Sequence, residues 1–176
     1  MSRDVGEPIA TSSQTVGPFF AIGLTTNRDL ARLVRPDVPG DRMHLIVRVL
    51  DGDGAPVPDA MVELWHADSA GHFLFGRSGT DAAGACAFET TRLAPSPQPR
   101  DASHVNVCLF MRGLLRHLYT RVYFRDDPAL EKDAVLALVP EDRRETLIAQ
   151  PVPNSPGTWV FEVRLQGAGE TVFFDP

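Results

Sequence analysis

The amino-acid sequence predicts an all-β fold, a sandwich or a barrel of mainly antiparallel strands. Segments rich in β-branched and aromatic residues recur along the chain, and several of them alternate apolar with polar residues. Turn residues, mostly Gly, Pro and Asp, separate these segments, and helix-like stretches are short insertions. The chain has 176 residues, 43% of them hydrophobic, which is enough for one domain with a sizeable core. We therefore expect a single domain over residues 1–176.

The predicted strands follow one another at short intervals. They lie at residues 43–50, 60–68, 73–81, 85–93, 104–113, 117–124 and 157–167. Only a few residues separate segments 104–113 and 117–124, so these two strands are expected to form a hairpin.

Other patterns mark the N-terminus and the insertions. Residues 1–22 lack a clear period and contain Gly17-Pro18, which predicts an extended arm because proline fixes its own φ and disfavours helix in the residue before it. A short helix is expected within 27–36, and two more within 127–150, where Asp127-Pro128 suits a helix start and Pro140 divides the segment.

Composition excludes several functional classes. The formal net charge of −6 argues against a nucleic-acid partner. No apolar run approaches the roughly 20 residues of a membrane span, and the N-terminus lacks the apolar segment of a secretory signal. The two cysteines, Cys86 and Cys108, are expected to be buried free thiols of a cytoplasmic protein, with Cys108 facing the core.

The segment "HVNV" (104–107) raises the question of a metal site. Its first and third residues, His104 and Asn106, share one face of a predicted strand, where two histidines would provide half of a metal site. The segment is either such a site with one ligand lost, or a strand-end histidine beside a locally bonded amide. The residues alone favour the second interpretation, because no histidine pair has H-x-H or HExxH spacing. Tyr119 and Tyr123 also share a strand face, and packing is favoured over metal ligation.

No nucleophilic centre is visible. The chain has no GxSxG elbow and no glycine-rich phosphate loop, and Ser78 and Ser103 lack an obvious base. Three arginines, Arg112, Arg116 and Arg121, lie around the predicted hairpin. They suit an anionic substrate, although solvated surface arginines are the commoner case. The residues alone therefore indicate an all-β domain without a visible catalytic set.

Five segments together resemble the intradiol ring-cleavage dioxygenases. They are "SSQTVGPFF", "VELWHADSAGHF", "HVNVCLFMRGLLRHLYTRVYF", "RRETLIA" and "GAGETVFFDP", in the family's order from about Ser13 to the C-terminus. The last two are most similar to the alpha chains of the family's two-chain, protocatechuate-cleaving members. The resemblance implies a β-sandwich with an extended N-terminal arm and short helical insertions. It also implies a homologous beta chain as partner, and O2-dependent opening of protocatechuate to 3-carboxy-cis,cis-muconate at Fe(III).

The chain departs from the family's iron site, in which two tyrosines and an H-x-H pair hold the metal. Here H-x-H reads His104-Val105-Asn106, and the stretches that match the tyrosine ligands, 71–81 and 90–99, contain no tyrosine. Tyr119 and Tyr123 follow the H-x-H position and do not match those ligands. The resemblance therefore implies no metal in this chain and Fe(III) in the beta chain.

The resemblance also assigns residues that reach the partner's substrate. Thr15, Gly17, Pro18 and Arg112 match the family's substrate-binding positions, and Phe19 stands where tyrosine is often found. Three alternatives remain open. The arm can be a tether that touches no ligand, the chain can be a binding or scaffold protein without catalysis, or it can be an independent iron enzyme with unusual ligands.

Overall fold

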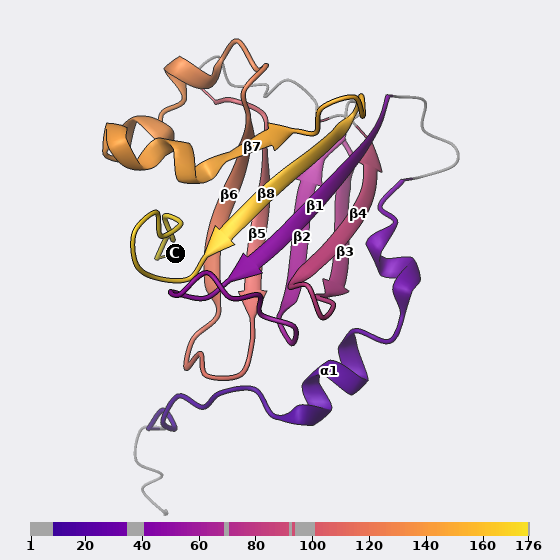
Figure 1. Ribbon diagram of the computed structural model, residues 1–176, viewed down its shortest axis with the longest axis vertical. Coiled ribbons are helices and arrows are strands. Elements are labelled where there is room, and N and C mark those ends of the chain that lie inside the picture. The colour runs from indigo at the N-terminus through magenta and orange to yellow at the C-terminus, as the bar shows by residue number, and fades with distance from the viewer. Residues whose placement is uncertain (1–8, 35–40, 69–70, 92, 94–100, 176) are drawn as a thin grey trace, which may run out of the picture.

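The computed structural model describes residues 9–34, 41–68, 71–91, 93 and 101–175. Within these residues eight strands form one hydrogen-bonded sheet in the order β3-β2-β5-β6-β7-β8-β1-β4 (Figure 1). The strands are β1 (Arg42–Leu50), β2 (Met61–Ala67), β3 (Phe73–Gly79), β4 (Ala85–Thr91), β5 (His104–Phe110), β6 (Leu118–Phe124), β7 (Ile148–Pro151) and β8 (Thr158–Arg164). The all-β prediction is confirmed.

Strand β7 joins the two halves of the sheet. It pairs in parallel with β6, where Tyr123 lies opposite Ile148, and antiparallel with β8, where Gln150 lies opposite Val160. The strand patterns did not reveal this four-residue strand, whose first three residues lie in the segment 127–150 that was expected to be helical. The hairpin of β5 and β6 is confirmed as an antiparallel pair.

The main core lies between the two halves of the sheet. Alternate residues of β1 and β8 point inward from one half, and alternate residues of β2, β5 and β6 point inward from the other, forming one cluster. Its least exposed members, each at 1% or less, include Leu45, Val47, Val49, Phe88, Phe161, Val163, Val62, Leu64, Val105, Val107, Leu109 and Val122. This burial is why the alternating segments were recognisable as strands.

The expected helices between 127 and 150 are short 3-10 turns. They are η2 (Leu130–Lys132), η3 (Leu136–Leu138) and η4 (Glu141–Leu147), and Pro140 separates η3 from η4 as expected. The helix expected within 27–36 is the 3-10 turn η1 (Arg28–Ala31), and Pro36 lies outside the described residues. No helix in the described part of the chain is both long and apolar enough to cross a bilayer.

The prediction of an extended conformation as far as residue 22 is wrong. Residues 9–17 form neither helix nor strand, but Pro18–Leu24 form the α-helix α1. Gly17 is the extended N-cap, with φ of −89° and ψ of 175°, and Pro18 begins the helix. A proline suits this position because its fixed φ fits the first turn, where its missing N–H is not needed.

The N-terminal segment runs below the lower ends of the strands and past the edge formed by β3 and β4 in Figure 1. The Phe20 ring of α1 lies 5.5 Å from the Phe110 ring at the end of β5. Farther along, Leu33 packs over Gly76 of β3, where an added Cβ would come within 2.4 Å of the leucine side chain. These contacts hold α1 and the residues after it against the sheet.

Candidate functional site

The β5–β6 hairpin ends in a tight turn that presents Arg112. The Leu114 N–H donates to the Met111 carbonyl at 3.4 Å, and Gly113 has a φ of +93°. Type II turns require positive φ at this third position, where glycine has no steric penalty. Arg112 therefore occupies the second position of the turn, beyond the last residue of β5.

The N-terminal arm is hydrogen-bonded to this turn. The Gly113 backbone N–H donates to Thr15 Oγ1 at 2.8 Å. Thr15, one of the predicted substrate residues, therefore contacts the residue that directly follows Arg112, another of them. The other two, Gly17 and Pro18, follow at the exposed start of α1, with open space around Gly17 where a Cβ would be.

The Arg112 side chain is anchored at its base. Its Nε donates to Asp59 Oδ2 in an ion pair, with 70% of the arginine side chain and 29% of the aspartate side chain exposed. Sequence reasoning missed Asp59, because an aspartate in a proline-containing turn before a strand carries no local signal of its partner 53 positions away.

Asp59 stands on a well-fixed turn. Thr80 Oγ1 donates to the Val57 carbonyl at 2.7 Å and accepts from the Ala60 N–H at 3.1 Å. The Thr80 N–H in turn donates to the Ala60 carbonyl at 2.8 Å. Val57 and Ala60 are both buried. The carboxylate that meets Arg112 therefore projects from backbone that is held on both sides.

An aromatic row extends from α1 across the outer face of the sheet. It consists of Phe20, Phe110, His117, Tyr119 and Trp65, whose successive ring centroids are 5.5, 5.3, 4.7 and 6.3 Å apart. His117 Nε2 also lies 2.8 Å from the Tyr119 hydroxyl. These contacts hold α1 against the hairpin by aromatic packing.

The metal-ligand candidates lie at the other end of β5. His104 and Asn106 face outward, on the side opposite to buried Val105 and Val107. His104 Nδ1 is 3.0 Å from the Ala102 carbonyl, which can only accept, so Nδ1 carries the proton and Nε2 is an acceptor. Burial lowers the pKa of His104 below its ordinary value, so the neutral imidazole is favoured.

The hydroxyl groups of the two tyrosines of β6 form hydrogen bonds with other side chains. The Tyr123 hydroxyl donates to Asp133 Oδ1 at 3.1 Å, and both residues are buried. Asp133 also accepts from the backbone N–H groups of Ala102 and Leu136, at 2.8 and 2.7 Å. Burial raises the pKa of Tyr123 to about 12, which disfavours the phenolate that a ferric ion would need. Tyr119 pairs with His117 in the aromatic row.

The donors in this region do not fit a mononuclear ferric site. Within the described residues they are one imidazole, one neutral amide and the Tyr123 phenol, which stays protonated and bonded to Asp133, and amides are poor ligands for transition metals. Among the described residues no group of three His, Cys, Asp or Glu side chains is arranged to hold a metal ion. Residues 94–99, within one of the stretches that match the family's tyrosines, lie outside the described part of the chain.

The two candidate regions are at opposite ends of one strand. His104 begins β5 and Phe110 ends it, and at about 3.3 Å per residue these positions are roughly 20 Å apart. Arg112 lies beyond Phe110, at the far end. Thr15 and Arg112 therefore do not line the pocket that His104 would mark.

The three arginines near the hairpin do not form one group. Arg121 lies opposite Asn106 on β6, and its Nη1 is 3.5 Å from the Tyr123 hydroxyl. Its charge is one of the secondary influences that lower the pKa of His104. Arg116 is exposed in the hairpin loop. Of the three, only Arg112 adjoins Gly113, whose N–H bonds to Thr15 of the arm.

Cys108 is buried but does not face the core. It lies between core residues Val107 and Leu109 on β5, so its side chain is on the outer face, between Glu63 and Tyr119 of the neighbouring strands. Burial raises the pKa of the Cys108 thiol to about 12. Both cysteines are free and buried, as expected.

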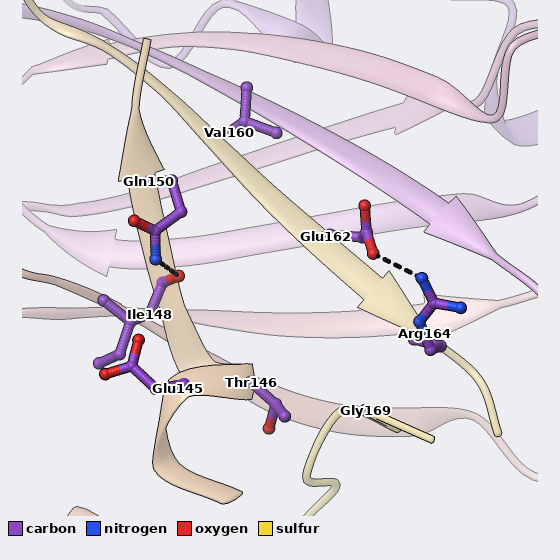
Figure 2. Close-up of a pocket in the computed structure, with 8 residues that line it drawn as sticks. All are labelled: Glu145, Thr146, Ile148, Gln150, Val160, Glu162, Arg164 and Gly169. Atoms are coloured by element: carbon purple, nitrogen blue, oxygen red, sulfur yellow. Dashed lines mark hydrogen bonds and ion pairs between the residues drawn. The ribbon is translucent and has the colours of Figure 1, made fainter. Parts of the chain in front are cut away.

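A pocket of about 390 Å³ lies elsewhere, between η4, β7 and β8 (Figure 2). Its charged walls are already paired, since Arg164 donates to Glu162 at 3.0 Å and Glu145 pairs with Arg125. The Gln150 amide also donates to the Ile148 carbonyl at 3.3 Å. The described residues that line the pocket offer no unpaired charge to a ligand, so the hairpin site is the stronger candidate.

Comparison with known proteins agrees with the motifs. A family profile described as Dioxygenase matches residues 15–167. The chain belongs to the intradiol dioxygenase family. It is 40% identical over 190 residues to the protocatechuate 3,4-dioxygenase alpha chain of Burkholderia cepacia, covering 94% of this chain and 96% of the relative.

Two further matches show how far the likeness extends. The protocatechuate 3,4-dioxygenase beta chain of Burkholderia cepacia is 30% identical over 132 residues, which is 63% of this chain and 56% of that one. The dioxygenase domain of a carbohydrate-binding fusion protein from Streptomyces sp. SirexAA-E superposes with a TM-score of 0.65 at 20% identity, over 89% of this chain and 99% of that one. The second match shows a shared fold.

Proposed function

We propose that this chain is the alpha subunit of a protocatechuate 3,4-dioxygenase and completes the substrate pocket of an iron-bearing beta chain. In the assembled enzyme, O2 opens the ring of protocatechuate between its two hydroxyl-bearing carbons, giving 3-carboxy-cis,cis-muconate. The near full-length identity to an alpha chain supports the subunit assignment. The observation that carries the division of roles is the placement of Thr15 and Arg112 at the end of β5 remote from His104.

This placement favours action on another chain. A pocket built at His104 within this chain would lie roughly 20 Å from the arm, measured along β5. The hairpin end, in contrast, is exposed at Thr15, Gly17, Pro18 and Arg112. Residues presented in this way are accessible to a neighbouring subunit.

Arg112 has the chemistry to recognise the substrate's carboxylate. Its Nε is engaged by Asp59, which leaves the Nη1 and Nη2 edge of the guanidinium for a carboxylate. Arginine binds carboxylates through two parallel hydrogen bonds along such an edge. We assign Arg112, with Thr15, Gly17 and Pro18, to the wall of the shared pocket.

Exposed apolar side chains around the arm support a protein partner. Ile9, Phe19, Ile22 and Leu115 are 93, 82, 62 and 62% exposed. Clusters of large exposed apolar residues mark interaction surfaces in soluble proteins. A beta chain covering the arm, α1 and the hairpin loop would bury them.

The Fe(III) of the enzyme belongs, in this proposal, to the beta chain. The donor set around His104 and Asn106 does not fit the metal, whereas Thr15, Gly17, Pro18 and Arg112 match the substrate-binding positions that the resemblance assigns. The free thiols Cys86 and Cys108 suit the reducing cytoplasm.

Mixing the chains tests the proposal. Purified alpha chain, purified beta chain and the co-expressed pair would be compared by O2 uptake on protocatechuate, with iron measured in each sample. We expect full activity only in the co-expressed pair, with the iron accompanying the beta chain. Beta-chain activity that is unchanged by this chain would favour a non-catalytic scaffold or binding role. Stoichiometric iron and activity in this chain alone would show an independent enzyme.

A further inference from the structure

We propose that Asp59 is a positioning residue that holds the Arg112 guanidinium in the orientation that receives the substrate carboxylate. This inference rests on the proposed role of Arg112 in substrate binding. Asp59 would not touch the substrate itself. Its contribution would be made through the ion pair with Arg112 Nε.

The need for such a residue follows from the exposure of Arg112. The side chain is 70% exposed and projects from a turn, so little packing restricts its rotamers. A long arginine that is free to move must be ordered when the substrate binds, at an entropic cost that weakens binding. An ion pair formed before binding removes part of that cost.

The backbone on both sides of the pair is restrained. Asp59 lies in the turn that Thr80 fixes through hydrogen bonds to residues 57 and 60. On the other side, Thr15 accepts from the N–H of the Arg112–Gly113 peptide. The carboxylate and the arginine backbone are therefore both held, and their ion pair also fixes the side chain between them.

The ion pair uses Nε and not the edge formed by Nη1 and Nη2. Asp59 engages Nε, and a bidentate carboxylate can still use Nη1 and Nη2. A carboxylate so close also lowers the net positive charge that an anionic substrate meets. Positioning and charge therefore act in opposite directions on the apparent KM, which allows an experiment to separate them.

Two substitutions at position 59 make this separation. Asp59→Asn removes the charge but keeps an oxygen that can accept from Arg112 Nε, whereas Asp59→Ala removes both. If Asp59 positions Arg112, Asp59→Ala raises the KM for protocatechuate roughly three- to tenfold, within the range of one ordinary net hydrogen bond, because both side chains are partly exposed to water. Asp59→Asn then keeps the KM near the wild-type value or below it.

The assay uses the co-assembled alpha–beta enzyme, with protocatechuate and with catechol, which lacks the carboxylate. The KM for catechol should be unchanged in both variants, and kcat should move little. Asp53, an exposed aspartate in the preceding turn, provides the matched controls Asp53→Asn and Asp53→Ala, which change the charge equally and should leave both KM values unchanged.

A double-mutant cycle with Arg112→Ala tests whether Asp59 changes the KM through Arg112. If Asp59 acts through Arg112, adding Asp59→Ala to Arg112→Ala raises the KM no further. The positioning role is overturned if Asp59→Ala lowers the KM for protocatechuate as Asp59→Asn does. It is also overturned if Asp59→Ala raises that KM by the same factor in the Arg112→Ala background as in the wild type. If instead Arg112→Ala raises the KM for both substrates equally, the carboxylate role of Arg112 itself is wrong, and the proposed pocket assignment fails with it.

Discussion

Thr15 and Gly113 are 98 positions apart in the chain, yet the Gly113 N–H donates a 2.8 Å hydrogen bond to Thr15 Oγ1. The bond joins the N-terminal arm to the turn that carries Arg112. Because the peptide that donates it links Arg112 to Gly113, the arm and the arginine are positioned together.

Removing this acceptor should loosen the arm. Thr15→Val keeps the side chain's shape but has no hydroxyl, and the loss of one net hydrogen bond of about 0.5–1.5 kcal/mol reduces the docked population roughly two- to tenfold. We expect faster hydrogen exchange at the Gly113 amide and a lower kcat/KM in the assembled enzyme. Thr15→Ser should restore both. Thr11→Val, the same change at an exposed position of the same arm, should alter neither, and an equal effect there would rule out a specific role for the Thr15–Gly113 bond.

Restoring the second histidine should not restore the metal. Asn106→His recreates H-x-H, but two imidazoles without phenolates hold Fe(III) weakly, because a hard ferric ion prefers anionic oxygen donors. We expect this variant, purified alone, to contain far less than one iron per chain by elemental analysis and to lack a tyrosinate-to-iron absorption band. A stoichiometric, coloured variant would mean that other residues of this chain complete the ligand set.

The buried Tyr123–Asp133 hydrogen bond should stabilise the fold. Tyr123→Phe removes one of the two donors to Oδ1 of Asp133, a residue that is 1% exposed and keeps the Leu136 N–H as a donor, at a cost of about 0.5–1.5 kcal/mol in the free energy of unfolding. Urea unfolding measures it. Tyr119→Phe removes a hydroxyl whose hydrogen-bond partner, His117, is exposed, and should cost less than half as much. If both variants lose the same free energy of unfolding, burial of the Asp133 carboxylate does not determine the loss.

Two histidines should make stability depend on pH. Burial lowers the pKa of His66 and of His104 below the ordinary value of 6.5. Below pH 6.5 the unfolded chain therefore binds more protons than the folded chain, so the free energy of unfolding falls as the pH is lowered through this window and recovers above it. Urea unfolding at pH 7.5 and 5.5 should show the loss.

Urea unfolding of histidine variants shows which residues cause this pH dependence. His66→Gln should reduce the difference between the two pH values, and adding His104→Gln should reduce it further. An unchanged difference in the double variant would assign the pH dependence to other groups.

The strands were predictable because burial leaves a local signal. Val105, Val107 and Leu109 alternate with outward-facing residues along β5, and the same alternation marked β1 and β8. Strand β7 left too little pattern, because only Ile148 and Ala149 of its four residues are buried. The helix α1 was missed because Gly17-Pro18 suits an extended chain and the start of a helix equally, and the contact that decides, Phe20 on Phe110, is remote in sequence.

The site was predictable only in part for the same reason. The family motifs pointed to Thr15 and Arg112, and the structure shows that the arm reaches the turn that carries Arg112. Asp59 belongs to no recognised motif, and its partner lies 53 positions away. A pairing set by tertiary structure leaves no periodic trace in the sequence, so it becomes visible only in the three-dimensional structure.

The two ends of β5 should differ in which substitutions natural selection tolerates. In the proposed division of roles, a side chain at the His104 end has only to be compatible with folding, so many replacements there would be neutral provided that Tyr123 and Asp133 keep their hydrogen bond. At the Arg112 end, an acceptable residue would also have to suit a second polypeptide encoded by another gene. A single seven-residue strand would thus drift freely at one end and coevolve with a partner at the other.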